Sequence, residues 1–369
     1  MMDYDVIVVG AGPAGSAAAK AAAERGAKTI LLEEHSAIGL PQHCSGLFYG
    51  TRSGIGEKIL ASMDPRVIVD KVKHRRIYSP KGKLFDIPLE GQGVYQLDRA
   101  FFDMQLAGQA AQAGAEIRIN AKVTDLAYDG NTVIGVKIHS KAYPEIRGKI
   151  VIIADGIKSL IGGLPIRSGI AEKVPYIDSG ISMLLVNVKD IDRGVHELHV
   201  GPHGTRNGYP GWIWLHRLDA YTCHSVFESI EAFEKCKTGD YIISNKLRDS
   251  VPVKKVGYSM ALFGAKSLPQ KVADGVMLAG NAANFGMFQL AMLSGQYAGQ
   301  VAGEAIKDGD VSKERLSIYN ELSRKLDDPQ LGLRFGFSSF VGLTEDEQEE
   351  KFLKMTQETS VNFDVLDFI

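Results

Sequence analysis

The chain has 369 residues, of which 45% are hydrophobic and 23% charged, with a formal net charge of -2 at pH 7. This length predicts two domains rather than one small core, and the near-neutral charge argues against a nucleic-acid partner. No run approaches about eighteen apolar residues, so no membrane span is predicted. The three cysteines are scattered, which favours a reducing cytoplasm and excludes a C-x-x-C site for zinc or an iron–sulfur cluster; we expect no metal.

The first predicted element is a short apolar strand that leads directly into three glycines. Residues 5–9 are followed by Gly10, Gly12 and Gly15 in G-x-G-x-x-G spacing, then by an alanine-rich helix and a second strand that ends at Glu33. In such a βαβ unit the glycines allow a tight turn, close approach of a diphosphate and close helix packing. The terminal carboxylate is placed to accept hydrogen bonds from a ribose. The pattern therefore predicts a dinucleotide site.

The next stretch is predicted to alternate loops, strands and a capped helix. Residues 34–66 read as a loop with a short helix, and residues 67–95 as antiparallel strands around a turn at 79–82. Asp98 is the predicted N-cap of a helix that runs to about Ala113. The helical start therefore carries its own capping side chain.

A hairpin and two buried strands follow this helix in the prediction. Residues 116–120 form a short strand, and residues 123–128 and 132–139 flank the turn Asp-Gly-Asn. Residues 149–154 read as a buried strand that ends at the pair Asp155-Gly156, both residue types that suit turns.

The C-terminal half is predicted to be β-rich first and helical later. Residues 170–257 read as strands and turns, and residues 275–280 as a buried strand. Helices are expected over 287–306 and 313–326, whereas the acidic stretch 327–369 fits no single pattern.

Strands of the parallel type therefore occur near both ends, with antiparallel material between them. We expect an α/β fold in which a Rossmann-like nucleotide-binding domain is assembled from separated segments. An antiparallel β-rich domain is inserted into it, and a helical C-terminal tail follows. The expected division is 1–69, 96–168 and 258–310 for the nucleotide-binding domain, 70–95 and 169–257 for the β-rich substrate domain, and 311–369 for the tail.

The order of these motifs resembles FAD-dependent flavoproteins of the p-hydroxybenzoate hydroxylase type, and among them the geranylgeranyl reductase family. The resemblance covers residues 3–160 well and 270–306 in part. It implies FAD as the cofactor and a set of residues that bind it: Gly10, Gly12, Gly15, Glu33, Arg99, Asp155, Gly156, Gly280, Asn281 and Gly286.

The loop 41–46 resembles the reductase motif P-x-x-C-[AGS]-G, whose cysteine lies near the flavin ring. The resemblance thus implies a catalytic role for Cys44, with His43 beside it as a candidate proton donor. Gly39 and Gly46 bracket the loop and would let the backbone turn sharply on both sides.

The sequence departs from the family in two places. The usual G-D-A-A is here Gly280-Asn281-Ala-Ala, which keeps an acceptor oxygen but loses the charge, and the loop that follows it to Gly286 is shortened. The family's substrate strand P-x-G-Y-x-W-x-F-P is here Pro-Gly-Trp212-Ile-Trp214-Leu-His-Arg. Both tryptophans are expected to bind substrate, and the added polar residues point to a substrate less purely apolar than a prenyl chain.

The resemblance implies an enzyme, an FAD-dependent oxidoreductase that reduces carbon–carbon double bonds of a prenyl lipid or similar hydrophobic substrate. The alternatives are an electron-transfer or quinone-type flavoprotein oxidoreductase without an iron–sulfur cluster, an FAD-dependent monooxygenase, and a flavin-binding protein that has lost catalysis. No second G-x-G-x-x-G follows a strand, so the electron donor stays open among NAD(P)H, ferredoxin and a deazaflavin. We expect a cytoplasmic protein, with peripheral contact to the membrane surface if the substrate is a lipid.

Overall fold

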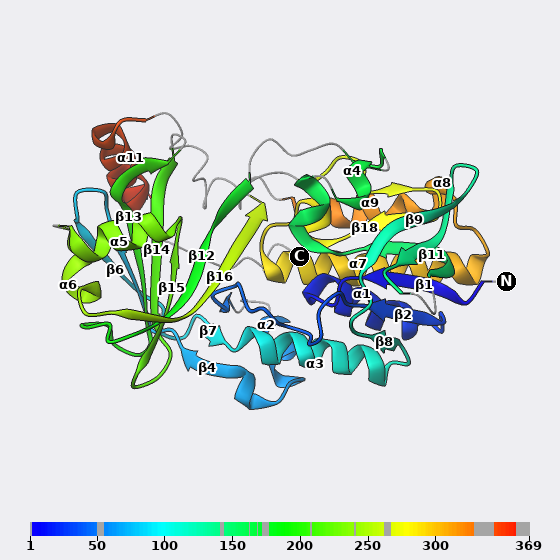
Figure 1. Cartoon of the computed structure of the whole chain (residues 1–369), viewed down its shortest axis with the longest axis horizontal. Helices are drawn as coiled ribbons and strands as arrows, with labels where there is room; N and C mark the ends of the chain where they lie inside the picture. Colours follow the sequence, from blue (N-terminus) through cyan, green and yellow to red (C-terminus); the bar gives the residue numbers. More distant parts are fainter. Residues whose placement is uncertain are drawn as a thin grey trace.

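The computed structural model describes residues 2–49, 55–140, 144–161, 163–167, 169–171, 177–206, 209–239, 241–261, 267–327 and 343–358. The chain forms two lobes that lie side by side (Figure 1). The α/β lobe is built on an eight-stranded sheet, and the β-rich lobe on a seven-stranded sheet. A three-stranded sheet lies along one edge between them.

The α/β lobe has a parallel centre made from distant segments of the chain. Its sheet has the order β17-β18-β11-β1-β2-β8, and β10 and β9 extend from β11. The parallel strands are β1 (Tyr4–Val9), β2 (Thr29–Leu32), β8 (Glu116–Arg118), β11 (Glu145–Ile153) and β18 (Val276–Leu278). The antiparallel strands are β9 (Val123–Asp129), β10 (Thr132–Ile138) and β17 (Val272–Ala273). The central strands are almost wholly apolar because both of their faces are buried.

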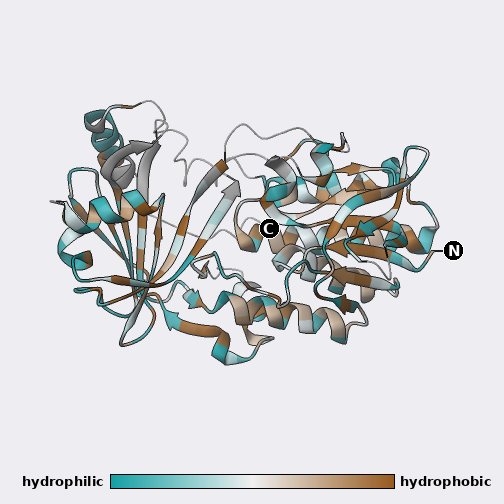
Figure 2. Ribbon diagram, viewed as in Figure 1, coloured by the Kyte–Doolittle hydropathy of each residue, from teal (hydrophilic) through white to brown (hydrophobic). Residues whose placement is uncertain are grey.

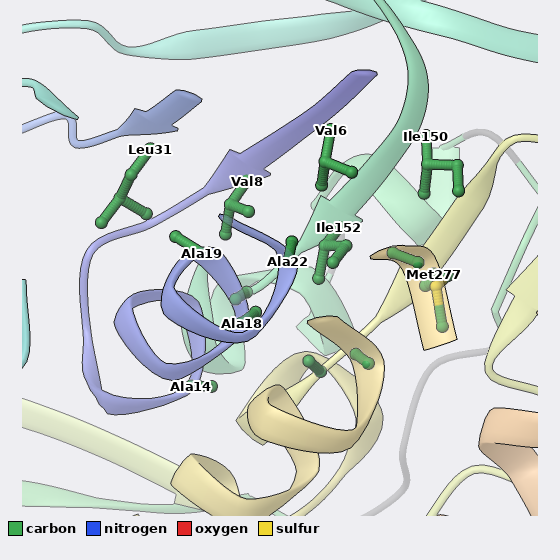
Figure 3. Packing of buried hydrophobic residues seen from close by; sticks show 14 of the residues in the cluster. Val6, Val8, Ala14, Ala18, Ala19, Ala22, Leu31, Ile150, Ile152 and Met277 are labelled. Carbon is green, nitrogen blue, oxygen red and sulfur yellow. The ribbon is translucent and has the colours of Figure 1, made fainter. Parts of the chain in front are cut away.

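Two helices lie on one face of this sheet and pack very closely against each other. They are α1 (Pro13–Ala23) and α7 (Phe288–Asp308). A Cβ added to Gly295 would lie 1.9 Å from the Ala14 carbonyl oxygen, and one added to Gly299 would lie 2.1 Å from that of Ala18. These glycines therefore let the two backbones touch. Figure 3 shows the small side chains of α1 against Val6, Val8 and Ile152 of the sheet.

A third helix, α3 (Arg99–Gln112), contributes Ala107 and Ala110 to the same core. Asp98 caps it, since its side chain accepts a hydrogen bond from the Phe101 N–H at 3.0 Å. The opposite face of the sheet packs against β9 and β10, through Leu126, Val133 and Val136. The α/β lobe also contains the short helices η2 (Gly156–Ile161), α4 (Leu164–Arg167), η3 (Gly280–Ala283), α8 (Lys313–Leu316) and α9 (Ile318–Arg324).

The β-rich lobe is an almost entirely antiparallel sheet of order β16-β12-β15-β14-β13-β5-β6, in which β5 and β13 are the one parallel pair among the strands that the structure describes. Its strands are β5 (His74–Tyr78), β6 (Leu84–Pro88), β12 (Ile177–Val186), β13 (Val195–Arg206), β14 (Tyr209–Arg217), β15 (Thr222–Phe227) and β16 (Val251–Ala261). Figure 2 shows hydrophobic residues along the strands of both lobes. Alternation along these strands gives the sheet two chemically different faces.

One face of the β-rich sheet is apolar and is covered by α5 (Ile230–Thr238) and α6 (Ser244–Leu247). Leu185, Ile213 and Phe227 pack there against Phe233 of α5 and Leu247 of α6. On the other face, α11 (Glu345–Glu358) lies at the β5–β6 side and is mostly hydrophilic in Figure 2. Its Phe352 packs edge-on against Phe85, with ring centroids 5.3 Å apart.

The third sheet has the order β3-β7-β4, with β3 (Leu47–Tyr49), β7 (Val94–Leu97) and β4 (Ile68–Lys71). The short helices α2 (Ile55–Ala61) and η1 (Pro65–Val67) join its strands. Because β3 follows directly on the loop 41–46, this sheet carries that loop to the boundary between the lobes.

Most of the predicted elements are confirmed, and the differences have simple causes. The predicted hairpin corresponds to β9 and β10, and the predicted helix over 287–306 to α7. The region 170–257 was expected to hold only strands and turns, but it also contains α5 and α6. Ser229 caps α5 by accepting from the Ala232 N–H, a start signal that the strand-rich surroundings obscured. The predicted helix 313–326 is divided into α8 and α9 at Ser317.

Candidate active site

The G-x-G-x-x-G segment forms the turn between β1 and α1. Gly10 has φ +95° and lies against β11, since a Cβ there would be 2.6 Å from the Ala154 carbonyl oxygen. A Cβ on Gly15 would be 1.8 Å from the Gly10 carbonyl oxygen, so this position closes the turn. A Cβ on Gly12 would meet nothing within 4 Å. Gly12 is the N-cap of α1 without a side-chain cap, so the helix start presents uncapped N–H groups on an open side.

Glu33 lies just after β2 and is buried, with 9% of its surface exposed. Its Oε2 accepts a hydrogen bond from the Ala11 N–H at 2.9 Å, and its Oε1 accepts one from the His35 N–H at 2.9 Å. The carboxylate therefore ties the glycine turn to the end of β2. Contact with a ribose stays a prediction.

Asp155 and Gly156 follow β11 and meet the same turn. A Cβ on Gly10 would lie 3.1 Å from Asp155 Cα, and Gly156 has φ +80°. Burial raises the pKa of Asp155 to about 6, although the Ser159 hydroxyl donates a hydrogen bond to its carboxylate. The structure thus brings this pair beside the glycine turn, and contact of the pair with a cofactor stays a prediction.

Gly280 and Asn281 approach the turn from the other side of β11. Gly280 has φ +63°, and a Cβ there would lie 2.6 Å from the Ala14 Cβ of α1. Its N–H donates to the Ser294 hydroxyl at 2.7 Å. Within the described residues, the buried Asn281 Oδ1 and Gln289 Nε2 have no hydrogen-bond partner. Buried polar atoms without partners are costly, so both indicate a polar ligand at this position.

A cavity of about 230 Å³ begins at these two side chains and extends to the β-rich lobe. The α/β lobe contributes Pro13, Asn281, Gly286 and Gln289 to its wall. The loop 41–46 contributes His43, Cys44 and Ser45, and the start of α7 contributes Met287 and Phe288. The β-rich lobe closes it with Arg75, Trp214, Val226, Tyr258 and Ser259. The cavity therefore joins the predicted cofactor segments to the predicted substrate sheet.

Arg99 lies in the cavity wall at the start of α3 and is buried. Its guanidinium donates to both carboxylate oxygens of Asp103, at 3.0 and 3.1 Å, and stands over the Phe288 ring at 4.2 Å from the centroid. Burial raises the pKa of Asp103, even though Arg99 faces it. The ion pair with Asp103 holds the guanidinium in the cavity wall. Arg99 is therefore a buried lining residue and not an exposed arginine at a helix start.

Cys44 is a free cysteine that faces Arg99, and its Sγ accepts a weak hydrogen bond from the Gly46 N–H at 3.5 Å. His43 is exposed at the cavity edge, where its Nδ1 lies 3.1 Å from the Pro41 carbonyl oxygen. Surrounding protein atoms and then the positive Arg99 lower the pKa of His43, so its ring is neutral at pH 7. A neutral imidazole can accept a proton on one nitrogen and release one from the other, so the ring can relay a proton.

Trp214 lines the cavity, and its contact with substrate stays a prediction, whereas the side chain of Trp212 lies outside the described residues. The sequence reading missed Tyr49, Arg75, Tyr258, Ser259 and Gln289, which also line it. Their sequence neighbourhoods carry no motif. The pairing of strands from distant segments places Arg75, Tyr258 and Ser259 in one sheet, and that pairing is not readable from one sequence. Tyr49 lies on β3 of the third sheet and Gln289 on α7.

The residues present fit FAD by three observations. The helix start at Gly12 is open where a diphosphate would lie, the buried Asn281 and Gln289 atoms await polar partners, and the cavity continues from them past an aromatic and basic wall. Pro13, which follows Gly12, lines that cavity together with Asn281 and Gln289.

Comparison with known proteins gives the same assignment. The model of the family described as "FAD dependent oxidoreductase" matches residues 5–258. The chain is 33% identical over 344 residues to a digeranylgeranylglycerophospholipid reductase of Methanosarcina acetivorans, which covers 87% of this chain and 81% of the relative. It is 30% identical over 335 residues to the protein of the same name from Methanoculleus marisnigri, with 86% and 81% covered.

Among solved structures, a geranylgeranyl bacteriochlorophyll reductase-like protein of Thermoplasma acidophilum superposes with a TM-score of 0.80 at 26% identity, over 99% of this chain and 95% of the other. A flavin-dependent brominase superposes with a TM-score of 0.70 at 18% identity, over 95% and 93%, a likeness of fold alone. The motifs, the cavity and these relatives agree. The chain belongs to the FAD-dependent oxidoreductases and, within them, to the geranylgeranyl reductase family.

Proposed function

We propose that this enzyme reduces carbon–carbon double bonds of a prenyl lipid or a similar hydrophobic chain. The observation that supports this most directly is a cavity that runs from the cofactor segments to the β-rich sheet past Cys44 and Trp214. The named relatives are reductases of digeranylgeranylglycerophospholipid, which favours the same class of substrate here. Bound FAD in its reduced form supplies the hydride equivalent that such a reduction needs.

The cofactor is proposed to be held by the segments that converge on the β1–α1 turn. The Gly10–Gly15 turn and the Asp155-Gly156 pair would hold the diphosphate, Glu33 the ribose, and Gly280, Asn281 and Gly286 the polar chain that leads to the flavin. Arg99, fixed by Asp103, would form one wall beside the ring. Asn281 can both donate and accept, so its orphaned oxygen suits a ribityl hydroxyl.

The chemistry also requires a proton, because an isolated alkene is poorly electrophilic. Cys44 is the proposed donor: its thiol is in the cavity wall and free of any disulfide. His43 is placed at the cavity edge and neutral at pH 7, so we propose that it returns a proton from solvent to Cys44 rather than acting as a stored acid.

The electrons must come from outside the chain. NAD(P)H, a ferredoxin and a deazaflavin are the proposed donors. We propose that the protein acts in the cytoplasm. If its substrate is a lipid, it must also contact a membrane surface peripherally. Among the helices that the structure describes, none is both long and apolar enough to cross a bilayer. We further propose that the cofactor domain comprises residues 1–69, 96–168 and 258–310.

The test is anaerobic reoxidation of the chemically reduced holoenzyme by candidate acceptors, followed through the flavin absorbance. A prenyl lipid should reoxidise the flavin and gain hydrogen, as mass spectrometry of the extracted lipid would show. Quinones and phenols with oxygen serve as the competing acceptors. Rapid reoxidation by a quinone, with no hydrogen gained by any prenyl compound, would assign the quinone-type activity instead.

A further inference from the structure

The face of the β-rich sheet that looks into the cavity carries a continuous strip of apolar side chains. Cross-strand partners share a face, so the register identifies the members of this apolar strip. It begins at the cavity and crosses five strands in the order Val226, Trp214, Leu198, Ile77 and Phe85. Three strand spacings of about 4.8 Å separate Trp214 from Phe85, so the strip extends about 14 Å beyond the tryptophan.

Trp214 belongs both to the cavity wall and to the core at the outer end of the strip. It lines the cavity, and it packs against an apolar cluster that has Leu198 and Phe352 among its buried members. The outer residues of the strip, Ile77 and Phe85, pack against the same cluster. An apolar chain that enters the cavity therefore meets a surface of its own kind that continues past Trp214.

Helix α11 covers the strip at the end far from the cavity. Its Phe352 exposes 7% of its surface and packs edge-on against Phe85, with ring centroids 5.3 Å apart. Its Glu349 is also buried and accepts hydrogen bonds from the Ser79 hydroxyl at 2.9 Å and the Lys81 N–H at 3.0 Å, both in the turn between β5 and β6. These contacts fix the Phe352 ring where the strip ends.

The cover that α11 provides differs from the cover on the opposite face of the sheet. There, α5 and α6 bury Phe233, Cys236 and Leu247 in a core shared with the strands. Helix α11 is mostly hydrophilic in Figure 2, and it adds the ring of Phe352 to the apolar cluster. It therefore acts less as a second core than as an end wall whose apolar contact is concentrated at one ring.

We propose that Phe352 determines the chain length of the substrate. The chain runs from its reacting end near Cys44 past Trp214 and along the apolar strip, and the ring of Phe352 is the stop that ends this path. Each carbon that reaches the strip is removed from water and adds to the affinity, whereas a chain that meets the ring must displace it or fold back. This inference rests on the proposed function for the chemical nature of the chain.

The experiment measures binding to the oxidised holoenzyme by the change in flavin absorbance, so it requires no turnover. The probes are geraniol, farnesol, geranylgeraniol and geranylfarnesol, which share one polar end and lengthen by an isoprene unit at each step. In the wild-type protein the affinity should rise along the series and then level off or fall at the alcohol whose chain reaches Phe352.

Two substitutions of Phe352 should move this limit in opposite directions. Phe352→Ala should move it to longer chains, so that the first alcohol beyond the wild-type limit binds at least about five-fold more tightly, because further apolar carbons are buried. Phe352→Trp should move it to shorter chains, since the larger ring takes part of the strip. Geraniol should bind all three proteins equally. Either shift tests the stop by itself if the other variant does not fold.

The matched control is Phe233→Ala, which removes a buried ring from the same lobe on the opposite face of the sheet. Phe233 belongs to α5 and packs edge-on against Phe227, with ring centroids 5.1 Å apart. This variant should lower the melting temperature but leave the dependence of affinity on chain length as it is in the wild-type protein.

Four results would overturn the inference: no binding of any of the alcohols, affinity that rises through the whole series in the wild-type protein, an unmoved limit in the Phe352 variants, or the same shift in Phe233→Ala. The proposed function fails separately. A limit that moves with Phe352, with no hydrogen gained by any prenyl compound, would leave the stop standing and remove the prenyl reductase activity. Reduction of a prenyl compound with an unmoved limit would do the reverse.

Discussion

The two lobes of this protein reach the cavity by different physical means. The α/β lobe presents backbone, at a helix start and three glycine positions whose spacing is visible in the sequence. The β-rich lobe presents side chains, from strands that meet only through long-range register. Backbone sites need particular residues at particular spacings, whereas side-chain sites need only a shared face. The first kind of site can therefore be recognised in one sequence, and the second cannot.

The sharpest test of the backbone site contrasts Gly12 with Gly15. Gly12→Val has room for its side chain in the protein and an ordinary φ of -74°, so the protein should fold normally yet lose FAD. Gly15→Val would collide with the Gly10 carbonyl oxygen, so that variant should fail to fold. Retained flavin absorbance and far-UV circular dichroism distinguish them. A yellow, fully loaded Gly12→Val protein would remove the diphosphate from this turn.

Cys44 tests whether the loop between the lobes is chemical or merely structural. Cys44→Ala should leave FAD bound and slow substrate-driven reoxidation of the reduced flavin by about 10²-fold or more, the usual contribution of a positioned acid. Cys44→Ser should retain part of the rate if the thiol only donates a proton. Gln42→Ala in the same loop is the control and should react normally. A wild-type rate for Cys44→Ala in anaerobic stopped-flow would assign the proton to another group.

The raised pKa of Asp155 in the α/β lobe predicts a pH dependence of folding stability. Burial raises its pKa from 3.8 to about 6, so the folded FAD-free protein binds more protons than the unfolded chain between these values. The stabilisation is complete below about pH 4 and is lost as the pH rises through 6, a change of at most about 3 kcal/mol. Asp155→Asn should flatten this part of the profile of melting temperature against pH. An unchanged slope would show that other groups cause it.

The smallest expected effect compares two helix caps, one in each lobe. Asp98 caps α3 and was predicted; Ser229 caps α5 and was not. Each side chain accepts a hydrogen bond from the backbone N–H three residues further on, through a carboxylate in Asp98 and a hydroxyl in Ser229. Asp98→Ala and Ser229→Ala should therefore each cost about 1 kcal/mol of unfolding free energy in urea titrations. A clear inequality would show that local context, not cap chemistry, sets their contribution.

What could be predicted from the sequence follows this division. The glycine turn, Glu33, the hairpin, the Asp98 cap and the loop around Cys44 are local patterns, and the structure places each near the expected element. Arg75 and Tyr49 lie in segments read only as a strand and a loop, and neither has a spacing that marks it. Gln289 occupies an ordinary helix-start position. The strand of Trp214 and His216 carries a degenerate motif, whereas His196 and His224 become neighbours of His216 only through the pairing of β13, β14 and β15.

The glycine contact between α1 and α7 also has a consequence for how the chain is made. Helix α1 spans residues 13–23, and its partner α7 spans residues 288–308. Strand β1 pairs with β11, and β11 pairs on its other side with β18, at residues 276–278. A growing chain on the ribosome therefore carries an alanine-rich helix and an apolar strand edge with no partner until most of the protein has been synthesised. Such surfaces aggregate readily, and long-range parallel pairing is slow. Chaperone demand during synthesis should thus fall only after about residue 308 has emerged, late in translation, and FAD can be captured only after that.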